Sequence, residues 1–185
     1  VFADDNLSME SDIGELEVKA SVVNGKIVGP IQEPIFDGRV TLLSGQFSLL
    51  DRPFAFKDGS YIENTSTLEF NPRYEIHAET IDPIGNVTLV TTDDRVRTRD
   101  LRITANFSGY LNEHRPPEFQ AEVLRKGASE QYQLTQRQIL SILTFGEPDA
   151  SETLSTSTTS DLLLRHSQRY LGNRFAKAIR FVDEF

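Results

Sequence analysis

The chain has 185 residues, a formal net charge of −9 and no cysteine. This length suits one domain with its own core, and the lack of cysteine excludes disulfides and cysteine-ligated metal within the chain. The acidic balance argues against a nucleic-acid surface, which needs clustered Lys and Arg. No run approaches the roughly 20 apolar residues of a membrane-spanning helix. Since Val1 does not begin a signal peptide, we expect a fragment of a longer protein with any membrane anchor upstream.

The first part of the chain predicts short strands. Residues 1–15 are acidic and without periodicity, which predicts a polar lead-in. Alternation from Leu16 to Val22 predicts a strand, and Asn24-Gly25 predicts a tight turn after it. Further strands are predicted over residues 35–43, 45–50, 53–57 and 60–63. Between them, Ser44-Gly45 indicates a bulge or bend, and Asp58-Gly59 indicates a second hairpin turn.

The clearest pattern is a strict alternation from Leu68 to Thr80, in which apolar residues are separated by mostly charged ones. Because successive side chains of a strand point to opposite faces, this predicts one long strand with a dry and a charged side. The same alternation recurs in several segments, so we predict a mainly β protein: a curved, U-shaped antiparallel sheet with an apolar concave face. The residues expected to line that face are Phe36, Val40, Leu42, Phe47, Phe54, Phe56, Leu68, Phe70, Tyr74, Ile76, Ala78, Leu89, Leu101, Ile103, Ala105, Phe107, Phe119, Ala121 and Val123.

The last third of the chain changes to helical periodicity. Thr135 is a predicted N-cap for a helix that ends at Phe145-Gly146, so residues 16–146 form the sheet with its first helix. Residues 147–160 predict a flexible linker. Within 161–185, an amphipathic helix is predicted to run to about Val182. One interpretation is a cap over the sheet, and the other is docking to a membrane surface or partner. Its basic face comprises Arg165, Arg169, Lys177 and Arg180.

Residues that carry enzyme chemistry are not arranged in a recognisable pattern. His77, His114 and His166 lack the spacing of metal ligands, and no serine has the context of a nucleophile. Paired acids such as Asp93-Asp94 fall in predicted loops, where a raised carboxyl pKa is uncommon. We therefore expect a protein that is not an enzyme and that binds neither cofactor nor metal.

Six segments, in order, resemble the C-terminal domain of the TamB family of the translocation and assembly module. They include a glycine-bounded strand over residues 37–47, a two-phenylalanine hairpin motif over 53–62 and an Asn-Pro strand over 71–78. A strand motif follows over 101–109, an Ile-Leu helix motif over 138–146, and a Leu-Gly motif at Leu171-Gly172. The resemblance covers roughly residues 24–182.

The resemblance implies a β-taco fold of the AsmA-like superfamily, with an apolar groove. It implies a periplasmic location, with the full-length protein anchored in the inner membrane. It also implies a partner, an outer-membrane barrel protein of the TamA/BamA class, and a role in phospholipid supply or barrel assembly.

The unequal sizes of the predicted layers favour an open groove, because two helices do not cover so many apolar strand positions. Such a groove suits a phospholipid acyl chain, a detergent or a nascent strand. Two alternatives stay open: a structural scaffold without a ligand, and a closed lipocalin-like barrel for a small ligand.

Overall fold

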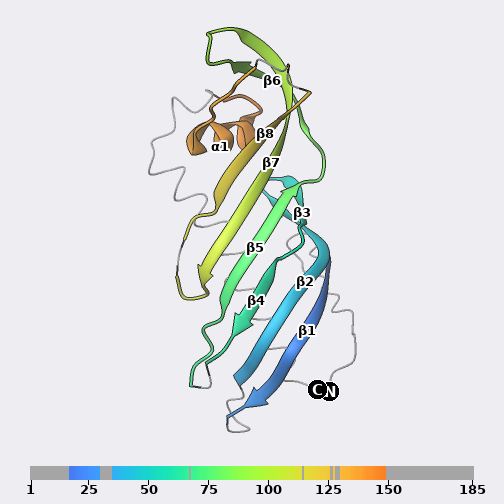
Figure 1. Cartoon of the computed structure of the whole chain (residues 1–185), viewed down its shortest axis with the longest axis vertical. Helices are drawn as coiled ribbons and strands as arrows, with labels where there is room; N and C mark the ends of the chain where they lie inside the picture. Colours follow the sequence, from blue (N-terminus) through green and yellow to red (C-terminus); the bar gives the residue numbers. More distant parts are fainter. Residues whose placement is uncertain are drawn as a thin grey trace.

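The computed structural model describes residues 17–29, 35–66, 68–113, 115–125, 127 and 130–148, with the backbone alone for residues 17–20. These residues form one antiparallel eight-stranded sheet and one helix (Figure 1). The elements are β1 (Glu17–Val28), β2 (Ile35–Leu49), β3 (Arg52–Phe56), β4 (Tyr61–Asn64), β5 (Arg73–Thr80), β6 (Ile84–Val90), β7 (Val96–Tyr110), β8 (Glu118–Leu124) and α1 (Gln136–Phe145). The predicted mainly β fold is confirmed. The predicted lead-in and the predicted helix over 161–182 lie outside the described residues, as does nearly all of the linker.

The strands follow one another across the sheet in chain order. β3 and β4 occupy one position between β2 and β5, because each of them pairs with both neighbours. β6 lies on the edge of β7 opposite β8, since Leu101 pairs with Ile84 on one side and Val123 on the other. Residues 104–106 of β7 likewise separate β5 from β8. The topology is therefore the predicted antiparallel meander, with β5 and β6 as one interrupted strand.

The prediction of a hairpin turn at Asp58-Gly59 is wrong. β3 and β4 run in the same direction, and the four residues between them interrupt a single strand position. Ser60 lies in this gap, where its hydroxyl donates to the carbonyl of Lys57 at 2.8 Å and accepts from the His77 N–H at 2.9 Å. Asp58 and Gly59 form a turn within this gap: the Ser60 N–H donates to the Lys57 carbonyl at 3.4 Å, and Gly59 adopts a φ of 89°.

The prediction of a turn at Asn24-Gly25 is also wrong, because β1 continues to Val28. The register with β2 shifts between Val23 and Lys26, so these residues form a bulge with Asn24 at φ 54°. Because the bulge adds one residue, the residues of β1 after it point to the opposite faces from those that an unbroken alternation would give them. Lys26 joins the polar face, where its ammonium lies 2.9 Å from Asp37, and Ile27 joins the apolar face.

The irregularity predicted near Ser44-Gly45 is present, within one continuous strand. Ala20 and Lys19 of β1 pair with Leu42 and Ser44 of β2, which leaves Leu43 as the extra residue. Leu43 is 49% exposed, and after it the inward positions change from even to odd numbers. Phe47 therefore faces the same side as Leu42.

The strand predicted from Leu68 to Thr80 begins only at Arg73. The Ser66 hydroxyl accepts bonds from the N–H groups of Leu68 and Glu69, both at 3.3 Å, and this local turn holds the segment out of the sheet. Leu68 is 91% exposed as a result.

The apolar face of the sheet is concave. β2 and β7 are separated in the sheet by β3 and β5, and these three steps would span about 14 Å in a flat sheet. The ring centroids of Phe47 on β2 and Phe107 on β7 are nevertheless 5.9 Å apart. The rings meet because the sheet curls toward its apolar side. Ala78 of β5 and Ala105 of β7, which pair with each other, have small side chains that leave room for the rings.

Among the described strands the sheet is open, because β1 and β8 lie at its two ends and do not pair with each other. This overturns the closed-barrel alternative. No helix within the described ranges has the length and apolar character needed to cross a membrane.

Candidate functional site: the apolar concave face

Most of the residues predicted to line the groove are gathered on the concave face, where their side chains pack together as a hydrophobic core. The buried ones are Leu42, Phe47, Phe54, Tyr74, Ile76, Ala78, Leu89, Leu101, Ile103, Ala105, Phe107 and Phe119. Within this part of the face, side chains fill the curve of the sheet. The structure thus corrects the prediction of an open groove for this part of the face.

The remaining predicted residues keep some exposure or lie elsewhere. Phe36, Val40, Phe56, Phe70, Ala121 and Val123 are half-buried. Leu68 and Phe70 belong to the connection before β5, not to a strand, so the assignment of Leu68 to the groove is wrong. Arg165, Arg169, Lys177 and Arg180, the predicted basic helix face, lie outside the described residues.

Helix α1 covers one end of the concave face, against β8 and β6 (Figure 1). Its buried residues Ile139, Leu140, Ile142 and Leu143 belong to the same core as the strands. The Gln136 amide also completes the outer edge of β8, accepting from the Phe119 N–H at 2.8 Å and donating to its carbonyl at 2.5 Å.

The predicted limits of α1 are confirmed. Thr135 and Gln138 form a capping box, in which each side chain bonds the backbone N–H of the other. Gly146 ends the helix in a left-handed conformation at φ 84°. The helix therefore starts and stops where the sequence predicts.

An aromatic cluster crosses the middle of the concave face. It consists of Phe47, Phe54, Phe56 and Phe107. Phe47 is its centre, with its ring centroid 5.8 Å from that of Phe54, 5.2 Å from Phe56 and 5.9 Å from Phe107. These distances are typical of favourable aromatic pairs, so the cluster ties β2, β3 and β7 together.

The opposite end of the face, on β1 and β2, carries an apolar strip with substantial exposure. This open strip consists of Val22, Ile27, Phe36 and Val40. Val22 pairs with Val40, and Ile27 with Phe36, so all four share the concave side. Val22 is 45% and Ile27 47% exposed. The only described helix, α1, lies at the other end of the sheet (Figure 1).

Sequence reasoning missed Val22 and Ile27 as site residues. The alternation places Val22 at the end of a predicted strand. A turn at Asn24-Gly25 would leave Ile27 outside that strand, whereas the bulge continues the strand and brings Ile27 to the apolar side. The detectable signal was the apolar pair Ile27-Val28 directly after Lys26, which resumes the strand pattern.

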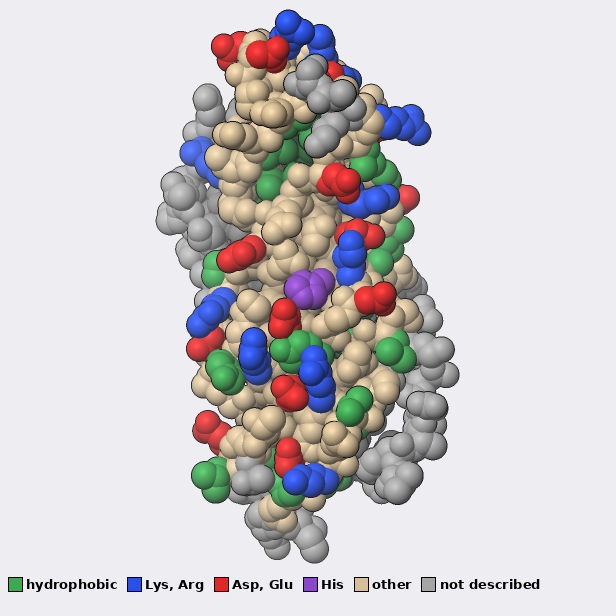
Figure 2. Space-filling model, in the orientation of Figure 1, with side chains coloured by type: hydrophobic (Ala, Val, Ile, Leu, Met, Phe, Trp, Pro, Cys, Tyr) green, Lys and Arg blue, Asp and Glu red, His purple; other side chains and the backbone are tan. Residues whose placement is uncertain are grey.

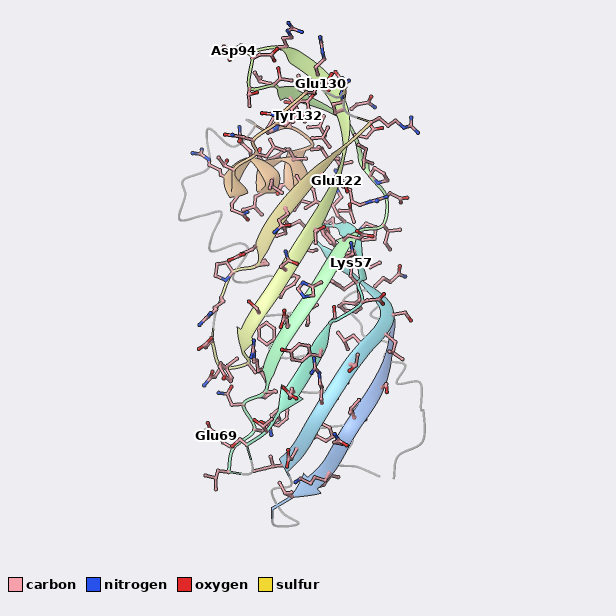
Figure 3. The ribbon with its side chains drawn as sticks, viewed as in Figure 1. Lys57, Glu69, Asp94, Glu122, Glu130 and Tyr132 are labelled. Carbon is pink, nitrogen blue, oxygen red and sulfur yellow. The ribbon has the colours of Figure 1, made fainter. Side chains whose placement is uncertain are left out.

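The other face of the sheet is polar, with positive and negative side chains interspersed around a histidine (Figure 2). Glu75 accepts from the Tyr61 hydroxyl at 3.0 Å and lies 3.4 Å from His77. His77 in turn contacts Asn106 at 2.8 Å. Lys57 projects from the break between β3 and β4 and pairs with Glu79 at 2.8 Å (Figure 3). Mutual pairing of this kind is typical of a solvated face.

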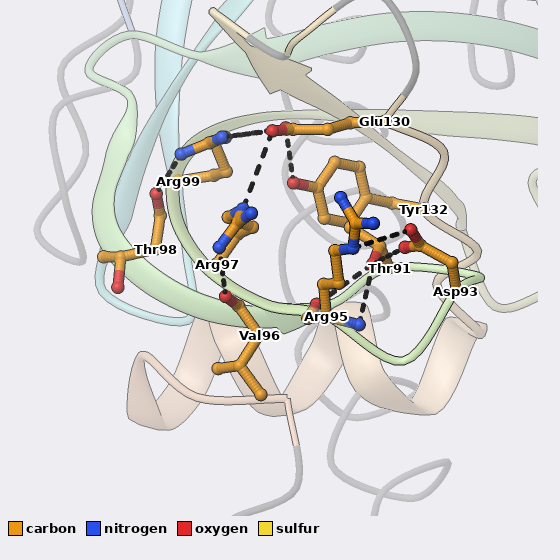
Figure 4. A network of polar contacts seen from close by, with 9 residues as sticks. All are labelled: Thr91, Asp93, Arg95, Val96, Arg97, Thr98, Arg99, Glu130 and Tyr132. Carbon is orange, nitrogen blue, oxygen red and sulfur yellow. Dashed lines mark hydrogen bonds and ion pairs between the residues drawn. The ribbon is translucent and has the colours of Figure 1, made fainter.

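A second polar network holds the connection between β8 and α1 (Figure 4). Glu130 accepts from the guanidinium of Arg99 at 3.0 and 2.5 Å and from the Tyr132 hydroxyl at 2.7 Å. The bonds from Arg99, and then that from Tyr132, lower the pKa of Glu130 to about 2. Burial, followed by the Glu130 bond, raises the pKa of Tyr132. Through the Arg99–Glu130 contact, this network holds the connection between β8 and α1 against the β6–β7 hairpin.

The described residues contain no group of three or more side chains placed to hold a metal ion. His77 lies on the polar face among Glu75 and Asn106, while His114 and His166 lie outside the described residues. Comparisons of the chain with protein-family models, with curated proteins and with solved structures find no match.

Proposed function

We propose that this chain is a non-enzymatic, periplasmic component of outer-membrane biogenesis whose open strip binds the acyl chains of phospholipid or a nascent strand of an outer-membrane barrel protein. The full-length protein would be anchored in the inner membrane. Its partner would be an outer-membrane barrel protein of the TamA/BamA class, as the resemblance to the TamB family implies.

The observation that carries this proposal is the open strip beside a packed core. Val22 and Ile27 are nearly half exposed although both face the apolar side, whereas the polar face carries ion pairs such as Lys57–Glu79 and Lys26–Asp37. An alkyl chain laid along the strip would remove this surface from water, with about 0.8 kcal/mol gained for each methylene buried. The strip therefore suits a long aliphatic ligand.

The experiment uses two substitutions on one strand. Ile27 faces the apolar side, and Val23, which pairs with Arg39, faces the polar side; they are 47% and 45% exposed. Ile27→Asp and Val23→Asp therefore place the same charge at equal exposure on opposite faces. The chain and both variants are purified without detergent, incubated with phospholipid vesicles and examined by native mass spectrometry.

We expect phospholipid to be retained by the unmodified chain and by Val23→Asp, and to be lost from Ile27→Asp, with similar melting temperatures for all three. Equal retention by both variants would show that lipid does not occupy the open strip. If the unmodified chain retains no lipid, the result supports the ligand-free scaffold instead.

A further inference from the structure

Strand β8 lies at one end of the sheet among the described strands, with β7 as its neighbour on one side. In an antiparallel strand, the backbone N–H and C=O groups of alternate residues point to the same side. Both backbone groups of Phe119 bond to the Gln136 side chain, so they point away from β7. Ala121 and Val123 are the next alternate residues and present their backbone groups on the same side. The backbone of these three residues makes up the outer edge of β8.

The Gln136 amide takes the place that a residue of a further strand would take beside Phe119. Its Oε1 accepts from the Phe119 N–H at 2.8 Å, and its Nε2 donates to the Phe119 carbonyl at 2.5 Å. Directly opposed residues of an antiparallel pair exchange the same two bonds. Gln136 is the first residue of α1, which packs against β8 and buries its apolar face in the core (Figure 1). A packed helix therefore holds this side chain on the edge.

The sequence of β8 suits pairing with the same strand of a second copy of the chain. In a two-fold antiparallel pair centred on Ala121, Phe119 lies opposite Val123 of the other copy. Both of these side chains belong to the apolar side of the sheet. On the polar side, Gln120 lies opposite Glu122, so that an amide meets a carboxylate. Cross-strand pairs of these kinds stabilise a sheet.

We propose that Gln136 closes this edge and thereby keeps two copies of the chain from pairing through β8. An exposed strand edge is a template for pairing with another chain, and natural sheets cover such edges. Because the Gln136 amide already satisfies both backbone groups of Phe119, an incoming strand gains fewer new hydrogen bonds, and this smaller gain does not offset the cost of association. The inference concerns β8 alone and does not depend on a lipid at the open strip.

The test is the oligomeric state, measured by sedimentation velocity over a range of protein concentrations. Gln136→Ala removes both bonds to Phe119 and keeps a strong helix former at the start of α1. We expect this variant to shift from monomer toward dimer as the concentration rises, where the unmodified chain sediments as a monomer. Gln133→Ala is the matched control, because it removes the same amide group from an exposed position before α1, and it should behave as the unmodified chain.

A second substitution identifies the interface. Ala121→Pro removes a backbone N–H that points away from β7, so the pairing of β7 with β8 keeps its hydrogen bonds. Added to Gln136→Ala, it should restore the monomer, because the centre of the β8–β8 pair loses its donor. Hydrogen exchange at the Ala121 and Val123 amides should be slower in the Gln136→Ala dimer than in the unmodified chain.

Gln136→Pro serves in place of Gln136→Ala if that variant does not fold, because proline is favoured at the first residue of a helix. A folded Gln136 variant that remains a monomer at every concentration would overturn the proposal, as would a dimer that persists after Ala121→Pro. Concentration-dependent slowing of exchange at Ala121 and Val123 in the unmodified chain would also overturn it, since the edge would then pair despite Gln136.

Discussion

At the scale of single residues, the face that a side chain occupies determines what its substitution does. Ile76 is 1% exposed in the core, and its neighbour Glu75 lies on the polar face. Ile76→Asp should lower the free energy of unfolding by on the order of 4 kcal/mol, because it buries an unpaired charge. Glu75→Ala removes one accessible hydrogen bond and should cost about 1 kcal/mol. Urea unfolding of both variants measures the difference; similar losses would contradict the assignment of faces.

Glu130 gives a prediction about acid stability. Its pKa is about 2 in the folded chain, below the ordinary 4.5, so the contact stabilises the fold fully above pH 4.5 and is lost as the pH falls toward 2. The unmodified chain should therefore be more stable than Glu130→Gln near neutral pH, and this advantage should shrink between those two pH values. The measurement is the free energy of unfolding of both proteins as a function of pH. A constant difference down to pH 2 would show that Glu130 has no depressed pKa.

At the scale of elements, the start of α1 depends on one side chain. Thr135→Ala removes the hydroxyl that accepts from the Gln138 N–H and should cost about 1 kcal/mol. Thr135→Ser keeps that acceptor and should retain most of the stability. Thermal unfolding of the two variants compares them directly. If both lose the same amount, the hydroxyl does not cap the helix.

The bulge in β1 gives a second prediction at this scale. Deleting Asn24 would place Gly25 opposite Gly38 in regular pairing, while Lys26 stays opposite Asp37 and Ile27 opposite Phe36. We expect the deletion to keep lipid retention, because Ile27 keeps its face. The exchange Lys26→Ile with Ile27→Lys puts the charge on the apolar side and should abolish retention in the same native mass spectrometry measurement. Loss of retention in the deletion, or normal retention after the exchange, would contradict this pairing of β1.

The elements also show what sequence can and cannot predict. The alternation correctly predicts strands at β5, β7 and β8, although β5 begins at Arg73 and not at Leu68, and the caps correctly predict the limits of α1, because face and cap are local properties. Asn24-Gly25 is mistaken for a turn, since a positive φ serves a bulge equally well. Asp58-Gly59 is a turn, but it interrupts one strand position and does not reverse the chain. The open strip depends on the bulge and on where α1 lies, and neither is encoded in the alternation. The same alternation identifies the core and the groove but does not separate them.

At the scale of the whole molecule, the sheet has a packed end under α1 and an open end on β1 and β2 (Figure 1). The open strip is an exposed apolar surface on the concave side, at the end away from α1. The central claim is that lipid occupies the concave side at this end.

Site-specific photocrosslinking tests that claim most directly. A benzophenone amino acid replaces either Phe36, on the concave side, or Tyr110, an exposed aromatic residue that pairs with Arg73 on the polar face. Each protein is irradiated with radiolabelled phospholipid vesicles, and the label attached to the protein is measured. The account predicts strong labelling at position 36 and background labelling at position 110. Equal labelling at the two positions, or none at position 36, would contradict it.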